Sequence, residues 1–472
     1  MTFRTAAGPA VAALLVATAM ATVWSGGGGP PNVLLVTIDT LRADHLHCYG
    51  QSLPTSPNID ALAARSVVFD RAIAASGYTG PAHSSIMTSR YPRRHSTAFS
   101  NGLLELGGVE TLAEVFREGG YETAAFVSNA VLAARSGLNR GFEVYDDELP
   151  SAERNRSAMF ERVAPQTVER ALAWLARPRT KPFFLWVHFQ DPHGPYTPPE
   201  PYRDRFHIPP VGGEPELPVL SDDSGHEGIP PYQLVEGPRR VSDYRSRYAG
   251  EIAYTDRSVG DLLAAVERHG PAIVALTADH GESFGENGFY FAHGHSAAPD
   301  LSHVPLILSA PPLHAERRAD PVSHVDVMPT LLELAGRPVP AGVEGIALGP
   351  ILRARARVPA RAVFCDIGYE VGTYGVDDFL LATTREQKSW TLEVFYQSGR
   401  ADSEHAVAGS GELTVTQTFG WDGGPTWSAR NPDPELATRL AAYLVGSTAA
   451  GDPVRLSPAD RERLRSLGYL AQ

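Results

Sequence analysis

Two apolar runs, far apart in the chain, each end at acidic residues. Val33–Ile38 runs directly into Asp39, and Ile273–Thr277 is followed shortly by Asp279 and His280. Runs of this length and composition are typical of buried strands in a parallel sheet. Ligands of open α/β sheets bind where such strands end, at their carboxyl edge. The pattern therefore predicts a single divalent metal held between distant parts of the chain.

The expected metal follows from the chemistry of its ligands. Asp39 and Asp279 offer carboxylates and His280 offers an imidazole. Carboxylates suit hard divalent ions, whereas the imidazole favours zinc or manganese over calcium or magnesium. We expect one firmly bound ion, zinc or manganese by preference, with calcium or magnesium also compatible.

A hydroxyl group is the expected fourth ligand. Thr79 stands two residues before Pro81, which is a favourable residue in the first turn of a helix. The hydroxyl would lie at the positive end of that helix, and beside a divalent ion it would lose its proton readily and become a nucleophile. For an isolated threonine at such a place, capping of the helix is the commoner role.

The rest of the chain predicts an α/β fold. Near-continuous apolar strands alternate with amphipathic helices, which indicates a large, mostly parallel sheet sandwiched by helices. Residues 202–240 are rich in proline, glycine and aspartate, and we expect a long surface insertion near the site. After Pro338-Val339-Pro340 the pattern changes to short strands followed by a helix at Pro434–Val445. We therefore predict a catalytic domain over residues 31–345 and a small α+β C-terminal domain over 346–472.

Charge and the N-terminal segment restrict the partners and the location. A net charge of -13 over 472 residues argues against a nucleic-acid partner, because phosphate backbones require basic surfaces. Residues 1–30 carry an apolar run and a Gly-rich tether, and we expect a cleaved signal peptide, with a single membrane anchor as the alternative. The protein is then exported to the periplasm or the cell exterior. Cys48 is expected to be a packed thiol.

Several motifs together resemble the sulfatase branch of the alkaline-phosphatase superfamily, in the right order from about Pro31 to Leu352. The resemblance rests on the two strand ends described above and on further short motifs. These are Leu41-Arg42-Ala43-Asp44, Cys48-Tyr49-Gly50, Thr88-Ser89-Arg90-Tyr91-Pro92, Asp191-Pro192-His193-Gly194-Pro195-Tyr196, Glu251-Ile252-Ala253-Tyr254 and Asp279-His280-Gly281-Glu282.

The chain departs from this family at the residues that bind and attack sulfate. The family's Cys-x-Pro-x-Arg motif, whose cysteine matures to formylglycine, reads here from Thr79 to His83. The family's Gly-Lys-x-His motif falls on residues 127–130, where both cations are missing. A later sulfate-binding lysine falls on His295, and a second metal-binding aspartate falls on Thr40. Losing the nucleophile and several cations together argues against ordinary sulfatase chemistry.

The residues that remain resemble the threonine-nucleophile phosphoesterases and phosphotransferases of the same superfamily. That resemblance implies a metal held by Asp39, Thr79, Asp279 and His280, with attack by Thr79 on phosphorus. It also implies further site residues that bind phosphoryl oxygens or protonate the leaving group. These are Asn129, His193, His293, His295 and His83. We interpret His188, inside a strand, as a hydrogen-bonded core residue.

The sequence therefore predicts an exported, metal-dependent hydrolase that cleaves a phosphoester, or transfers the phosphoryl group, through a covalent intermediate on Thr79. The substrate would be the ester of a small molecule, a lipid headgroup or a glycan. Two alternatives stay open. One is a sulfatase that works without formylglycine, and the other is an inactive glycan-binding protein that keeps the fold.

Overall fold

A computed structural model describes residues 29–95, 109–237, 239–359 and 361–367, together with the backbone of four later strands. The predicted signal peptide or anchor and the predicted helix at Pro434–Val445 lie outside these residues. In the described part of the chain, none of the helices combines the length and the apolar character that a membrane span requires.

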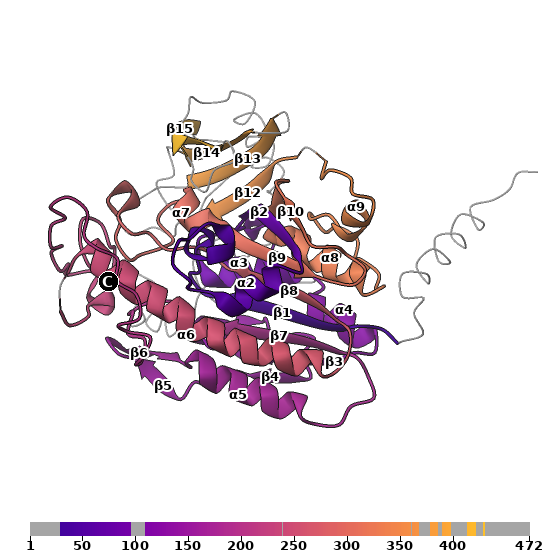
Figure 1. Cartoon of the computed structure of the whole chain (residues 1–472). Helices are drawn as coiled ribbons and strands as arrows, with labels where there is room; N and C mark the ends of the chain where they lie inside the picture. Colours follow the sequence, from indigo (N-terminus) through magenta and orange to yellow (C-terminus); the bar gives the residue numbers. More distant parts are fainter. Residues whose placement is uncertain are drawn as a thin grey trace, which may run out of the picture.

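The centre of the fold is a twisted sheet with a parallel core (Figure 1). In the described chain it has nine strands in the order β10-β2-β9-β8-β1-β7-β3-β4, with β11 beside β2. Strands β8, β1, β7, β3 and β4 run parallel, whereas β9 runs antiparallel to both β8 and β2. The bounds are β1 Asn32–Ile38, β2 Val67–Ile73, β3 Glu122–Phe126, β4 Val144–Asp146, β7 Phe183–Phe189, β8 Ala272–Ala278, β9 His303–Ser309, β10 Glu316–Arg318 and β11 Val322–Ser323.

The register of the three central strands determines where the site forms. Ile38, the last residue of β1, pairs with Phe189 on one side and with Ala278 on the other. The residues that follow β1 and β8, Asp39 and Asp279, therefore leave the sheet at the same level. This alignment is what the two apolar runs predicted.

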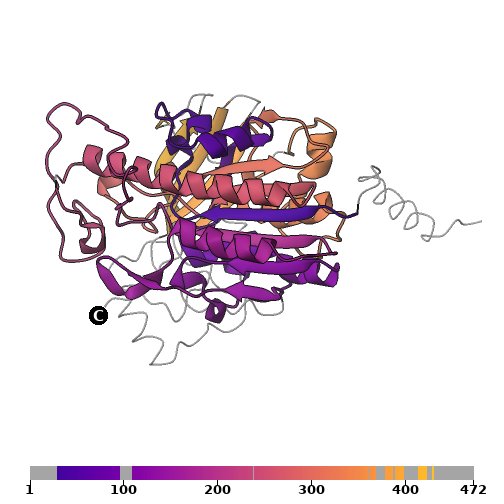
Figure 2. The ribbon, with the colours of Figure 1, turned by 60° about the horizontal axis from the view of Figure 1, so that its bottom comes forward.

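Helices cover both faces of the sheet, which buries the central strands β1 and β7 completely and explains their apolar composition. Helix α6 contacts both α2 and α5 on one face, where it crosses in front of the sheet in Figure 1 and runs along it in Figure 2. Helices α3, α4 and α8 form a second group of mutual contacts. The bounds are α2 Pro57–Ala63, α3 Thr79–Thr88, α4 Leu112–Glu118, α5 Ala164–Leu175, α6 Val241–Glu267, α7 Pro299–Ser302, α8 Val327–Leu334 and α9 Gly349–Arg353.

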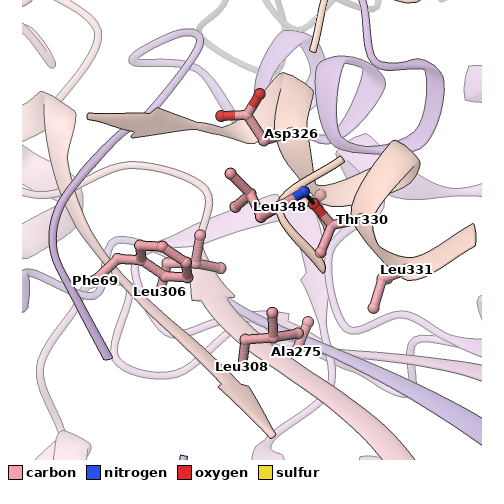
Figure 3. A pocket seen from close by; sticks show the side chains of 9 residues that line it. Phe69, Ala275, Leu306, Leu308, Asp326, Thr330, Leu331 and Leu348 are labelled. Atoms are coloured by element: carbon pink, nitrogen blue, oxygen red, sulfur yellow. Dashed lines mark hydrogen bonds between the residues drawn. The ribbon is translucent and has the colours of Figure 1, made fainter. Parts of the chain in front are cut away.

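The packing between the sheet and α8 leaves one very small internal cavity, of about 10 Å³ (Figure 3). Its wall is mostly apolar, with Phe69, Leu306 and Leu308 among the lining side chains. A void of this size is close to the lower limit for a single water molecule. The cavity is therefore a packing feature of the core and not a ligand site.

Two further regions lie outside the main sheet. A five-stranded antiparallel sheet follows among the described residues, and its first strand docks beside β2, where the Asp366 N–H donates to the Ala75 carbonyl at 2.9 Å. Residues 202–240 have little regular structure, as expected. The remaining bounds are β5 Ser151–Glu153, β6 Arg156–Glu161, β12 Val363–Ile367, β13 Asp378–Arg385, β14 Ser389–Gln397, β15 Leu413–Trp421 and β16 Ser428–Ala429.

Strand β2 and helix α6 are among the elements that differ from the sequence-based expectation. Strand β2 was not predicted, because Asp70 and Arg71 interrupt its apolar run, although Arg71 is only 1% exposed. The apolar periodicity of the sequence predicts a helix over Tyr248–Arg268, whereas helix α6 already begins at Val241. Its first two turns are rich in polar residues, and the apolar periodicity that marks the rest of the helix is weak there.

Candidate metal centre and active site

Four side chains from three elements converge at the carboxyl edge of the sheet. Asp39 follows β1, Asp279 and His280 follow β8, and Thr79 is the first residue of α3. The Nε2 atom of His280 lies 3.9 Å from Asp39 Oδ1 and 3.6 Å from Asp279 Oδ2. It lies 3.4 Å from the Thr79 hydroxyl oxygen. We call these four residues the metal cage.

The metal cage has the properties of a divalent metal site. Ligand atoms of Asp39, Asp279 and His280 all lie within 4.8 Å of one another, and the three side chains are 0% exposed. Asp39 Oδ1 and Asp279 Oδ2 are buried and have no hydrogen-bond partner among the described residues. First-shell distances of about 2.0–2.2 Å place tetrahedral ligand atoms roughly 3.3–3.6 Å apart. The donor set and its spacing therefore fit one divalent ion.

The imidazole of His280 is fixed in the tautomer that a metal requires. Its Nδ1 lies 2.9 Å from the Gly281 carbonyl oxygen, to which it donates, so Nε2 keeps its lone pair for the cage. A β-carbon at Gly281 would lie 2.0 Å from the Asp300 carbonyl oxygen. This close approach explains why glycine follows His280.

Burial and mutual repulsion act on the two carboxylates. Burial, and then the neighbouring Asp279, raise the pKa of Asp39 well above its usual value. At Asp279 burial also acts upward, but the imidazoles of His280 and His83 offset it, and the pKa is lowered. Burial likewise lowers the pKa of His280. Two buried carboxylates at this separation favour a cation between them.

Thr79 lies at the start of α3 but does not cap it. The helix begins at Thr79 itself, and Tyr78, which occupies the N-cap position, makes no capping hydrogen bond with its own side chain. The Thr79 side chain is 2% exposed and points to His280 Nε2. The commoner role of an isolated threonine at such a place is therefore not the one adopted here.

His83 holds Thr79 from one turn further along α3. Its Nδ1 lies 2.7 Å from the Thr79 carbonyl oxygen, and its Nε2 lies 3.0 Å from the Thr37 hydroxyl. Trp186 Nε1 donates to the same hydroxyl oxygen, so the hydroxyl proton goes to His83. Both nitrogens of His83 are thus engaged, and the residue positions Thr79.

His193 and His293 extend from the cage as a series of rings. The ring centroids of His280 and His293 are 4.6 Å apart, and those of His293 and His193 are 5.2 Å apart. His193 Nδ1 lies 2.8 Å from the Gly194 carbonyl oxygen, to which it donates. Burial, followed by the nearby His293, lowers the pKa of His193 well below its usual value.

Glu282 is a partner of His293 that the sequence reading missed. Glu282 Oε1 lies 3.0 Å from His293 Nδ1, and the Tyr196 hydroxyl donates to Glu282 Oε2 at 3.0 Å. Glu282 is 0% exposed. A buried carboxylate behind an imidazole holds its tautomer and stabilises its charged form, which is the arrangement of a catalytic acid or base.

His295 lies apart from the cage in the described structure. Its Nε2 lies 3.1 Å from the Ser283 hydroxyl, and its ring stacks on Phe289 with centroids 3.8 Å apart. Desolvation of the half-buried ring lowers the pKa of His295 to about 3. The structure therefore gives His295 an uncharged, packed environment and not that of a cation.

Asn129 and His188 both face Asp39. Asn129 Nδ2 donates to Asp39 Oδ2 at 2.9 Å, and its Oδ1 accepts from the Val131 N–H at 2.8 Å. The amide is therefore engaged with the protein at both ends. His188 was interpreted as hydrogen-bonded core, and this is wrong for one nitrogen. Its Nε2 is buried without a partner in the described chain and lies 3.8 Å from Asp39 Oδ2. No signal in the strand pattern distinguishes it from a core residue.

Cys48 and Cys365 are not joined by a disulfide in the described part of the chain. Burial raises the pKa of the Cys48 thiol, which agrees with the expected packed role.

Comparison with known proteins matches residues 31–337 to the model of the sulfatase family. The chain is 29% identical to a Δ4,5-hexuronate-2-O-sulfatase of Bacteroides thetaiotaomicron, over 68% of this chain and 72% of that protein. It is 27% identical to human iduronate 2-sulfatase, over 59% of this chain and 60% of that protein. The solved structure of a phosphonate monoester hydrolase of Agrobacterium radiobacter superposes with a TM-score of 0.65 at 21% identity, covering 89% of this chain and 95% of that one.

Proposed function

We propose that this chain, which belongs to the sulfatase family of hydrolases, is a metal-dependent phosphoester hydrolase with Thr79 as its nucleophile. The observation that carries the proposal is the position of the Thr79 hydroxyl, 3.4 Å from His280 Nε2 in a cage with two buried carboxylates. Asp39, Thr79, Asp279 and His280 would hold the ion. When bound, a divalent ion lowers the pKa of a coordinated hydroxyl and neutralises charge on the phosphoryl group.

The chain's own residues support a two-step transfer. Thr79, held by His83, gives up its hydroxyl proton to solvent and attacks phosphorus, so a bond forms from its Oγ1 to phosphorus while the bond to the leaving oxygen breaks. His293, held by Glu282 at Nδ1, has Nε2 left to give a proton to that oxygen. Water then attacks the phosphothreonine, which releases phosphate or its ester and restores Thr79.

His193 is better suited to contact the substrate as an acceptor. Its Nδ1 proton is committed to the Gly194 carbonyl, so the neutral ring offers only a lone pair at Nε2. The lowered pKa of the buried ring maintains this neutral form. We therefore assign the acid role to His293 and not to His193.

Sulfate ester hydrolysis is the second candidate, and the relatives favour it. Both curated relatives described above are named as sulfatases. A sulfuryl group has the same tetrahedral shape, and Thr79 could attack it by the same route. The named substrates of those relatives also make a glycan ester a reasonable class to test.

A panel of four p-nitrophenyl esters separates the candidates: a phosphodiester, a phosphonate monoester, a phosphate monoester and a sulfate. We expect the purified chain with zinc or manganese to hydrolyse one of the phosphorus esters at least tenfold faster than the sulfate. A strong preference for the sulfate would reject phosphoester hydrolysis in favour of the second candidate. No turnover of any ester, with metal bound, would support a binding protein.

The location of this activity is a separate proposal. Residues 1–30 have the sequence of a signal peptide or an anchor, and we propose export to the periplasm or the cell exterior. Fractionation of cells that express the full chain tests this, since cytoplasmic recovery of the unprocessed protein would oppose it.

A further inference from the structure

Two residues in the segment after β3 contact the surroundings of Asp39, Asn129 directly and Ser128 through His188. Asn129 binds Asp39 Oδ2 directly, as described above. The neighbouring Ser128 instead holds His188, the penultimate residue of β7. The Ser128 hydroxyl donates to the His188 carbonyl oxygen at 2.6 Å, and the Ser128 N–H donates to His188 Nδ1 at 3.4 Å. His188 in turn faces Asp39, with 3.8 Å between Nε2 and Oδ2.

The contact with Ser128 decides the tautomer of His188. Because Nδ1 accepts a hydrogen bond from a backbone N–H, it carries no proton in the neutral ring, and the proton lies on Nε2. This Nε2–H group is fully buried and has no partner among the described residues. Buried donors without an acceptor are rare and costly, so the group needs an explanation.

The distances alone would also allow His188 to bind a metal. Ligand atoms of His83, His188 and Asp279 lie within 4.8 Å of one another. The hydrogen bonds exclude this second ion, because both nitrogens of His83 are engaged and Nε2 of His188 carries the proton. Of the two carboxylates near His188, that of Asp39 approaches within 4.0 Å, its Oδ2 lying 3.8 Å from Nε2.

We propose that His188 is a positioning residue that donates from Nε2 to Asp39 Oδ2, and so turns Asp39 Oδ1 towards a single metal ion. The two atoms are about 1 Å farther apart than a hydrogen bond requires, so a small rotation of the carboxylate joins them. A donor on an anionic ligand fixes its orientation, and loss of such a partner typically weakens metal affinity roughly 10- to 100-fold.

This inference deepens the proposed metal centre and rests on it. It also gives a role to the segment that lacks the family's cations. Ser128 and Asn129 occupy that place and support the ligand Asp39, one through His188 and one directly. Where the family's cations would contact the substrate, Ser128 and Asn129 instead support the metal ligand Asp39.

Metal affinity tests the proposal without any need for activity. Zn²⁺ and Mn²⁺ are titrated into the metal-free full chain against a chromogenic chelator, for the wild type, His188→Met and His188→Gln. Methionine and glutamine have similar length, but only glutamine can donate to Asp39. We expect His188→Met to bind roughly tenfold or more weakly and His188→Gln to bind nearly as well as the wild type.

Two controls separate this role from general damage to the fold. His45→Leu changes another buried histidine, which packs against Tyr248 and Phe284, and we expect unchanged affinity. Thermal unfolding of the metal-free variants shows whether each one folds. Ser128→Ala, which removes the hydrogen bond from the Ser128 hydroxyl to the His188 carbonyl, is expected to weaken metal binding less than His188→Met.

Three results would overturn the proposal. Equal affinity of His188→Met and the wild type would show that His188 does not support Asp39. Equal loss in the methionine and glutamine variants would show that the donor is irrelevant. Binding of two ions per wild-type chain, reduced to one in both variants, would make His188 a ligand. A wild type that binds no ion would instead refute the metal centre itself.

Discussion

The metal cage and the histidine loop, residues 281–298, adjoin each other, but different interactions place their side chains. The cage residues after β1 and β8 leave the sheet at the same level because Ile38 pairs with Ala278. The histidine loop is not aligned with the cage by pairing of this kind between neighbouring strands of the main sheet. It is held by the Ser283–Ala292 and Phe291–Ser283 backbone hydrogen bonds and by Gln233, which donates to the Phe291 carbonyl.

This difference explains why the two histidines of the loop diverge. His293 finds the carboxylate of Glu282, whereas His295, two residues later, finds a hydroxyl and an aromatic ring. The sequence alone does not distinguish His293 from His295, because both flank the same glycine. Their partners give one the environment of a catalytic acid and the other that of a packed neutral ring.

The largest expected effect is at the cage. Thr79→Ala removes the nucleophile and should lower kcat/KM by about 10³-fold or more, with little change in folding. Thr79→Ser keeps a hydroxyl and should retain part of the activity. Steady-state rates on the best ester of the panel, with metal content measured for each variant, check this. An alanine variant of near wild-type activity would remove Thr79 from the chemistry.

Removal of the metal is expected to have the next largest effect. Dialysis against a chelator should abolish turnover and lower the Tm, because an ion that binds only the folded state stabilises it. Zinc or manganese should restore both. The Asp279→Asn variant should lose this response to metal, and a chelated wild type that stays fully active would contradict the cage.

At the loop we expect a smaller effect that depends on the leaving group. Glu282→Gln removes the carboxylate behind His293 and should slow alkyl esters about 10²-fold, since their leaving oxygen needs a proton. Esters of p-nitrophenol leave without that proton and should be slowed much less. Parallel rate measurements on both ester types check this. Equal losses on both would indicate structural damage in place of lost acid catalysis.

His295 should show the smallest effect. With its pKa lowered to about 3, the ring is neutral throughout the working pH range and cannot attract an anion by charge. We expect His295→Gln to change kcat/KM by no more than about fivefold, because the neutral packed ring makes no charged contact with the substrate that the variant could lose. The pH–rate profile should keep its shape. A hundredfold loss would show that both histidines of the loop act on the substrate.

Much of the cage could be predicted from the sequence, because strand ends and strand register follow from apolar periodicity. Asp39, Asp279 and His280 were placed in this way, and Thr79 was placed by its position before Pro81 at the start of a helix. The roles of His83, Asn129 and His188 could not be predicted, since each depends on which atoms face it after folding. Strand β2 was also missed. Asp70 and Arg71 interrupt its apolar run in the sequence, although Arg71 is buried after folding.

The central claim is that Thr79 carries the transferred group, and one measurement tests it most directly. The chain is mixed with the preferred ester, quenched in acid during turnover and digested with trypsin, and the peptide from Ala72 to Arg90 is fragmented in a mass spectrometer. We predict a phosphoryl adduct on Thr79, which disappears in Thr79→Ser in favour of an adduct on serine. A sulfuryl adduct, distinguished by accurate mass, would support the second candidate. An unmodified Thr79 during rapid turnover, or an adduct on another residue, would contradict the account.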